Sequence, residues 1–312
     1  MNLAQNLPPP ARGYRGRFAP SPTGPLHAGS LVAALGSWLD AKKNGGQWLL
    51  RIEDLDGPRC IPGADQEIMR QLLACGLVWD EDVTWQSQRQ ASYLKALEVL
   101  NQAKCLYPCG CSRQTIAKTL AAKGIATPRN QELVYPGTCR PNQTTLNDLS
   151  QQGVALRLAL PGDLQIEFAD QALGIQHENL VSGVGDFVLR RNDGLFTYQL
   201  AVVVDDAQQG ITNVVRGADL LSNTARQIHL QQLLNYPQLD YLHLPLVLDA
   251  HGEKLSKQTL AMPIQTHNAQ SALQALQQAA QHLGLQNLPS RSSLSIAEWL
   301  LAATQAWKNQ TA

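Results

Sequence analysis

Two short segments far apart in the chain carry residue types suited to binding a nucleotide. The first, R-F-A-P-S-P-T-G-P-L-H-A-G-S, begins at Arg17 and contains His27 and Gly29 just before apolar residues with helical spacing. A helix N-terminus offers free N–H groups and positive dipole charge to an anion, and Gly29 lacks the Cβ that would hold a ring or phosphate away. The second, E-K-L-S-K-Q, supplies Lys254 and Lys257, two cations suited to a polyphosphate leaving group. The two segments together predict a nucleotide site, whereas His27 by itself favours a histidine that only caps a helix.

Changes in hydrophobic periodicity predict the elements that position these segments. Strand and helix patterns alternate from Tyr14 to about Asn101, which is typical of a parallel α/β sheet. An Asp193-Gly194 turn predicts a hairpin between strands at 187–189 and 196–198. The other expected elements are strands at 47–52 and 244–248 and helices at 65–75, 89–103, 271–283 and 296–307.

The two segments resemble the HIGH and KMSKS signatures of class I aminoacyl-tRNA synthetases. More narrowly, R-F-A-P-S-P-T-G, R-I-E-D-L-D, T-Y-Q-L-A-V-V-V-D-D and R-G-A-D-L-L resemble glutamyl-tRNA synthetases, in the same order along the chain. Ser30 departs from the fourth HIGH position, and Leu255 and Gln258 depart from KMSKS. The resemblance implies a Rossmann-type catalytic domain in which His27, Lys254 and Lys257 act in catalysis. The residues it implies for ATP are His27, Gly29, Ser30, Ser256 and Lys257.

The charges expected around a glutamate substrate agree with this resemblance. Glutamate carries two carboxylates and one ammonium, so a specific site requires two cations and an anion. Arg17, Arg216 and Glu53 meet that count, although each of them alone would more often be a surface or ion-paired residue. The resemblance implies that the glutamate site comprises Arg17, Phe18, Ala19, Pro20, Ser21, Glu53, Tyr198 and Arg216.

The cysteines predict a second site. Cys109 and Cys111 flank one glycine, and with Cys139 they offer three thiolates for a structural Zn²⁺. Ligand softness favours Cys105 as the fourth ligand. The resemblance implies Tyr135 instead, because Y-P-G-T-C is similar to a Tyr-x-x-x-Cys zinc half-site of some glutamyl-type enzymes. We adopt Tyr135, since Cys105 lies in an apolar pattern and is expected to pack.

Composition and length narrow the class of protein. The chain has 312 residues and a formal net charge of zero, so no overall field draws it to nucleic acid and any RNA contact depends on local patches. No apolar run approaches the ~20 residues of a membrane span, and no signal-peptide core is present. We therefore expect a cytoplasmic protein that does not enter the membrane, and a monomer.

The predicted organisation has four parts. Residues 1–13 form a flexible tail, 14–103 and 148–250 the Rossmann-type catalytic domain, 104–147 a zinc-bearing insertion, and 251–312 the KMSKS-like loop with a short helical C-terminal segment. A full glutamyl-tRNA synthetase carries a large anticodon-binding region after its KMSKS loop, and few residues follow Gln258 here. We therefore expect no anticodon-binding domain.

The chain is thus most similar to the glutamyl-queuosine tRNA(Asp) synthetase family, the short paralogue of glutamyl-tRNA synthetase. This resemblance implies that ATP with Mg²⁺ activates L-glutamate to glutamyl-adenylate. The amino acid then passes to queuosine in the anticodon of tRNA(Asp). Two alternatives stay open: a truncated glutamyl-tRNA synthetase that charges the 3′ end of tRNA(Glu), and an inactive RNA-binding paralogue.

Overall fold

A parallel sheet at the N-terminal end of the chain forms the first layer. The computed structural model describes residues 13–125, 133–140, 146, 149, 153–247, 262–289 and 294–310. Strands β1 (Arg15–Phe18), β2 (Gln47–Ile52) and β3 (Thr84–Trp85) pair in parallel in that order. Helices α1 (Ala28–Lys43) and α2 (Ala64–Ala74) connect them, with short 3₁₀ turns at Gly57–Arg59 and Gln86–Gln88. The alternation follows the expected strand–helix–strand pattern.

A second sheet continues this layer and has the strand order β7-β6-β10-β9. Strands β6 (Gln165–Asp170), β10 (Asp240–Leu244) and β9 (Asn213–Gly217) are parallel, and β7 (Gly174–Asn179) is antiparallel to β6. The Thr212 N–H donates to the Arg15 carbonyl at 2.9 Å, which joins the start of β9 to β1. Helices α6 (Tyr198–Gln208) and α7 (Thr224–Leu234) pack beneath, and the 3₁₀ helix Ala218–Asn223 precedes α7.

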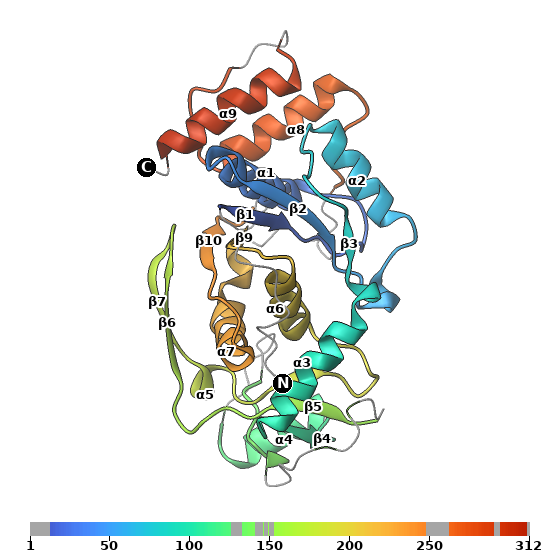
Figure 1. Ribbon diagram of the computed structural model, residues 1–312, viewed down its shortest axis with the longest axis vertical. Coiled ribbons are helices and arrows are strands. Elements are labelled where there is room, and N and C mark those ends of the chain that lie inside the picture. Colours follow the sequence, from blue (N-terminus) through green and yellow to red (C-terminus); the bar gives the residue numbers. More distant parts are fainter. Residues whose placement is uncertain are drawn as a thin grey trace.

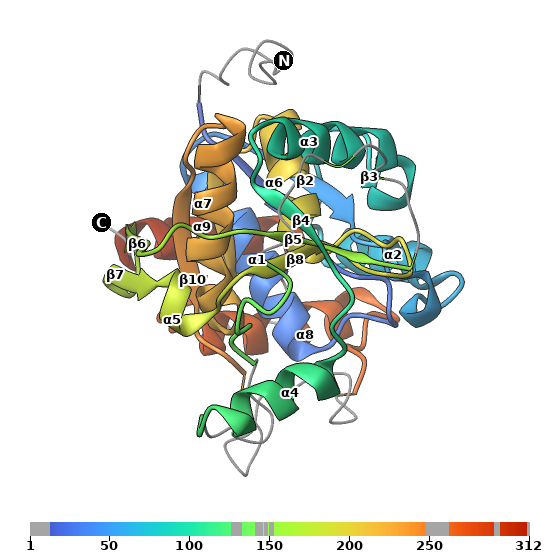
Figure 2. The same ribbon diagram turned by 90° about the horizontal axis from the view of Figure 1, so that it is seen from below.

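A small antiparallel sheet lies at the far end of the molecule (Figure 1). Its strands β4 (Leu106–Cys109), β5 (Ala155–Leu158) and β8 (Phe187–Arg190) pair in that order, and α3 (Gln90–Gln102) leads into it. Helix α4 (Arg113–Ala122) runs along one edge of this end, as Figure 2 shows, and α5 (Leu180–Gly183) is a single turn before β8.

The last two described helices cover the opposite end. Helices α8 (Ala269–His282) and α9 (Ile296–Gln310) lie over α1 in Figure 1. They bury Leu276 and Trp299 in one core with Leu35 of α1 and Trp48 of β2. The Trp307 indole N–H donates to Asp40 at 3.0 Å, which adds a buried hydrogen bond between α9 and α1.

Most of the elements expected from periodicity are confirmed, and two are wrong. Strand 47–52 and the four expected helices form within about a residue or two at most ends. The expected strand 244–248 is wrong, because β10 ends at Leu244 and Pro245 has no N–H to continue the ladder. The second strand of the 187–198 hairpin is also wrong: the turn forms, but only Phe196 bridges to Arg190, and Tyr198 begins α6.

Candidate functional site

The carboxyl ends of β1, β2, β9 and β10 open into one cleft of about 490 Å³. Ligands in open α/β sheets bind outside the carboxyl ends of the strands, so this is the expected position for a site. The cleft gathers the predicted residues that the structure describes, namely Arg17, Phe18, Ala19, Pro20, Ser21, His27, Gly29, Ser30, Glu53, Tyr198 and Arg216. Lys254, Ser256 and Lys257 lie outside the described residues.

The N-terminus of α1 forms one wall of the cleft. His27 is the N-cap residue, and its imidazole accepts a hydrogen bond from the Ser30 N–H at 3.3 Å. His27, Gly29 and Ser30 all line the cleft. His27 therefore caps the helix and also faces the cavity, so the two interpretations of this residue hold together.

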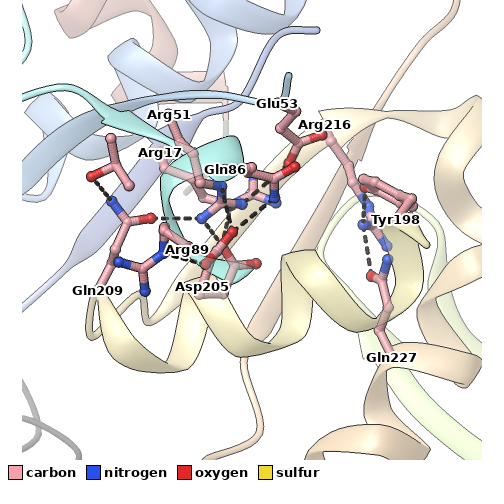
Figure 3. Close-up of polar contacts among 12 residues, drawn as sticks. Arg17, Arg51, Glu53, Gln86, Arg89, Tyr198, Asp205, Gln209, Arg216 and Gln227 are labelled. Atoms are coloured by element: carbon pink, nitrogen blue, oxygen red, sulfur yellow. Dashed lines mark hydrogen bonds and ion pairs between the residues drawn. The ribbon is translucent and has the colours of Figure 1, made fainter. Parts of the chain in front are cut away.

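Arg17 and Glu53, which line the cleft, meet two buried charged side chains behind it, Arg51 and Asp206 (Figure 3). Arg17 Nε donates to Asp206 Oδ1 at 3.1 Å, and Arg51 Nη1 donates to the same oxygen at 2.8 Å. Arg51 Nη2 donates to Glu53 Oε1 at 3.4 Å. Asp206 thus holds Arg17 against the sheet, and Arg51 links it to Glu53.

A further buried layer supports these residues from α6. Asp205 accepts hydrogen bonds from Arg89 Nε at 2.5 Å, Gln86 Nε2 at 2.8 Å and the Tyr93 hydroxyl at 2.8 Å. Sequence reasoning did not assign Arg51, Asp205 or Asp206 a role. All three residues lie in the motifs R-I-E-D-L-D and T-Y-Q-L-A-V-V-V-D-D. The Asp-Asp pair at the end of an apolar run was a further signal, because buried carboxylates are expected to be paired.

Glu53 is the anionic group of the cleft. Burial raises the pKa of its carboxyl to about 7, although Arg51 and Arg17 act in the opposite direction. The carboxyl is therefore partly protonated near neutral pH, and a cation in the cleft would favour its ionised form.

Arg216 lies across the cleft beside Tyr198 (Figure 3). Its Nη1 donates to the Tyr198 hydroxyl at 3.3 Å and to Gln227 Oε1 at 2.8 Å, and its Nη2 donates to Thr224 Oγ1 at 2.8 Å. Among the described residues, no carboxylate lies within ion-pair distance of this guanidinium, in contrast to Arg17 and Asp206. A buried arginine with only neutral direct partners is well suited to bind an anionic ligand.

The small sheet and the segment 133–140 bring together a cysteine cluster. The thiols of Cys109, Cys111 and Cys139 lie within 4.8 Å of one another. The Tyr135 hydroxyl is 3.4 Å from Cys109 Sγ and 3.6 Å from Cys111 Sγ, and it accepts from the Cys139 N–H at 2.9 Å. Cys105 is not part of this group and lies against the main core.

The cluster has the dimensions of a tetrahedral metal site. Zn–S bonds of about 2.3 Å place two thiolates about 3.8 Å apart, and Cys111 and Cys139 are 3.5 Å apart. Arg157 Nε donates to Cys109 Sγ at 3.2 Å, and its guanidinium lies 3.8 Å from the centre of the Tyr135 ring. Burial opposes ionisation of Cys109, but its hydrogen bonds with Tyr135 and Arg157 outweigh it and lower the thiol pKa. These residues fit Zn²⁺.

None of the helices in the described part of the chain has the length and apolar character needed to cross a bilayer.

Comparison with known proteins identifies the family. The model of the catalytic domain of class I tRNA synthetases (E and Q) matches residues 14–293. A Glutamyl-Q tRNA(Asp) synthetase of Burkholderia cenocepacia strain HI2424 is 54% identical over 295 residues, which is 95% of this chain and 96% of the relative. One from Cupriavidus metallidurans is 53% identical over 294 residues, or 94% of this chain and 91% of the relative.

Solved structures of similar proteins agree with the family. A glutamate tRNA ligase from Elizabethkingia meningosepticum, in complex with its amino acid, is 27% identical with a TM-score of 0.72, and covers 92% of this chain. A glutamate-tRNA synthetase from Elizabethkingia anophelis is 31% identical with a TM-score of 0.66, and covers 78%. The matched parts amount to 64% and 52% of those two chains. By these matches the chain belongs to the class I tRNA synthetases (E and Q) and, among them, to the glutamyl-Q tRNA(Asp) synthetase family.

Proposed function

We propose that this protein activates L-glutamate with ATP and transfers it to queuosine in tRNA(Asp). The observation that carries the proposal is the placement of Arg17, Arg216 and Glu53 in one cleft beside the N-terminus of α1. This is the count of two cations and one anion that glutamate requires. The acceptor nucleoside follows from the names of the relatives.

The charges around the cleft suggest a role for each group. Arg216 has only neutral direct partners, so it binds a substrate carboxylate. Glu53 binds the ammonium. Arg17 binds the other substrate carboxylate. Because Arg17 is already paired with Asp206, this carboxylate and Asp206 contact the same guanidinium.

The activation step needs no nucleophile from the protein. An α-carboxylate oxygen of glutamate forms a bond to the α-phosphorus of ATP as the bond to pyrophosphate breaks. When bound with ATP, Mg²⁺ would neutralise charge on the phosphate oxygens. His27, Gly29 and Ser30 place the nucleotide against the α1 N-terminus, and Lys254, Ser256 and Lys257 contact its phosphates. The protein contributes mainly orientation and electrostatic stabilisation.

Charging assays with radioactive glutamate test the acceptor. Queuosine-containing tRNA(Asp) should be charged, whereas the same tRNA lacking queuosine and tRNA(Glu) should not. Periodate destroys vicinal diols, including that of queuosine, so it should abolish charging even when the 3′ end is protected. Charging of tRNA(Glu) would instead support the truncated glutamyl-tRNA synthetase, and absence of glutamate-dependent pyrophosphate exchange would support the inactive paralogue.

We further propose that the cysteine cluster holds one structural Zn²⁺ through Cys109, Cys111, Tyr135 and Cys139. The four side chains come from β4, the residues after it and the segment 133–140. A closed four-ligand site would fix this segment to the small sheet. Arg157, which contacts Cys109 and Tyr135, would support the ligands from β5.

The proposed role of Glu53 predicts a pH dependence. Because the pKa of its carboxyl is raised to about 7, the group is neutral at lower pH and attracts the substrate ammonium less. We expect kcat/KM for glutamate to rise about tenfold per pH unit below this pKa and to level off above it, since kcat/KM reports the free enzyme. Pyrophosphate exchange between pH 5.5 and 8.5 measures this. The Glu53→Gln variant should have a low and flat profile, and a flat wild-type profile would contradict the role.

A further inference from the structure

A buried row of hydrogen bonds connects Arg216 to a carboxylate two strands away. Arg216 Nε donates to His243 Nε2 at 3.1 Å, and His243 Nδ1 lies 2.6 Å from Asp170 Oδ2. The three residues come from β9, β10 and β6, which are neighbours in one sheet, and Arg216 and His243 are register partners. Their exposed fractions are 5% for Arg216, 1% for His243 and 3% for Asp170.

The partners determine where the imidazole proton lies. A guanidinium has no lone pair to offer, so His243 Nε2 must accept from Arg216 and the ring proton is on Nδ1. Asp170 Oδ2 accepts a hydrogen bond from this Nδ1–H. Its oxygens also accept the backbone N–H groups of His243, Ala172 and Leu173, at 2.9 to 3.4 Å. Burial, and then the charge of Arg216, lower the pKa of His243, which keeps the ring neutral.

Arg216 and Arg17 differ in how the positive charge of each guanidinium is compensated. Asp206 contacts Arg17 directly, so a substrate carboxylate has to share that arginine. The negative charge of Asp170 reaches Arg216 only through a neutral imidazole, which partly offsets the cost of burying the guanidinium without placing a competing carboxylate on it. The hydrogen bond to Nε also fixes the plane of the guanidinium fork.

We propose that His243 is a positioning residue for glutamate: it orients Arg216 and leaves the charge of Arg216 available to the substrate carboxylate, while Asp170 holds the imidazole in the tautomer that can do so. The inference rests on the proposed function, because it assigns the binding role of Arg216 to a particular set of supports. It predicts that the acceptor at His243 Nε2 matters for glutamate and not for ATP.

Two substitutions at His243 test the roles of its two ring nitrogens separately. Glutamine can place its amide oxygen near the position of Nε2 and keep the acceptor for Arg216. Asparagine can place its amide nitrogen near the position of Nδ1, which keeps the donor to Asp170 but leaves Arg216 Nε without an acceptor. KM values for glutamate and for ATP are measured separately by pyrophosphate exchange, and thermal melts compare folding. His229→Asn, at a buried histidine on α7 outside these hydrogen bonds, is the control.

We expect His243→Asn to raise the glutamate KM roughly tenfold or more, as an unsatisfied buried charged donor would, with the ATP KM unchanged. His243→Gln should stay within about threefold of wild type, and so should His229→Asn. Equal glutamate KM values for the Asn and Gln variants, or equal increases for both substrates, would overturn the inference. If the Asn variant does not fold, the Gln variant decides: near-normal glutamate KM supports the role, and a large selective increase overturns it. A wild-type protein without glutamate-dependent exchange would instead refute the proposed function itself.

Discussion

Replacing Arg216 with methionine should lower kcat/KM for glutamate by roughly 10²- to 10³-fold, which is the usual loss when one partner of a buried charge pair is removed. Methionine retains much of the side-chain length but neither the charge nor the donors. The substrate carboxylate would then be buried without a counter-charge, and Gln227 Oε1 and Thr224 Oγ1 would lose their donor. Pyrophosphate exchange at varied glutamate concentration measures the loss.

Two control variants make this result specific. Arg70→Met removes an exposed arginine on α2, paired with Glu67 outside the cleft, and should leave kcat/KM unchanged. Arg216→Lys keeps the charge but not the planar fork, so it should recover only part of the lost activity. Wild-type kcat/KM in Arg216→Met would mean that glutamate does not bind this arginine.

Zinc content should fall from one ion per chain to near zero in Cys109→Ser, and also in Cys111→Ser and Cys139→Ser. Structural zinc contributes about 10–16 kcal/mol of apparent binding free energy in small zinc-binding peptides. Loss of one thiolate ligand should therefore cause a clearly measurable fall in zinc per chain. It should also lower the melting temperature, because the small core around Tyr107, Ile116 and Tyr135 includes these ligands. Elemental analysis of the purified variants measures the number of zinc ions per chain.

The control for the metal site is Cys105→Ser, which should keep its zinc because Cys105 lies outside the cluster. Tyr135→Phe should weaken retention of the metal against a chelator, since only the hydroxyl reaches the thiols. Loss of zinc from Cys105→Ser together with normal retention in Tyr135→Phe would restore the four-cysteine site.

Local sequence patterns predicted most of the expected helices and strands correctly. They failed where a strand-favouring pattern covered the start of a helix. The run from Phe196 to Val204 is apolar and rich in residues that favour strands, yet Thr197 is extended and a helix begins at Tyr198. That helix places Asp205 and Asp206 beneath the cleft, where they meet arginines from β1, β2 and the start of α3. Buried pairing of charges between distant segments outweighed local propensity.

The sequence by itself predicted which residues bind glutamate and zinc: the family resemblance, with the charge count of the substrate, pointed to Arg17, Glu53 and Arg216, and cysteine spacing pointed to the three thiols. Only the tertiary structure decided how each is supported. Arg17 has a direct carboxylate partner, whereas Arg216 is held by His243 from the neighbouring strand. The first contact depends on how α6 packs against the sheet, and the second depends on the register of parallel strands, which brings together residues 27 or more positions apart. The spacing of residues along the chain does not reveal which of them become neighbours, because the packing of strands and helices decides this.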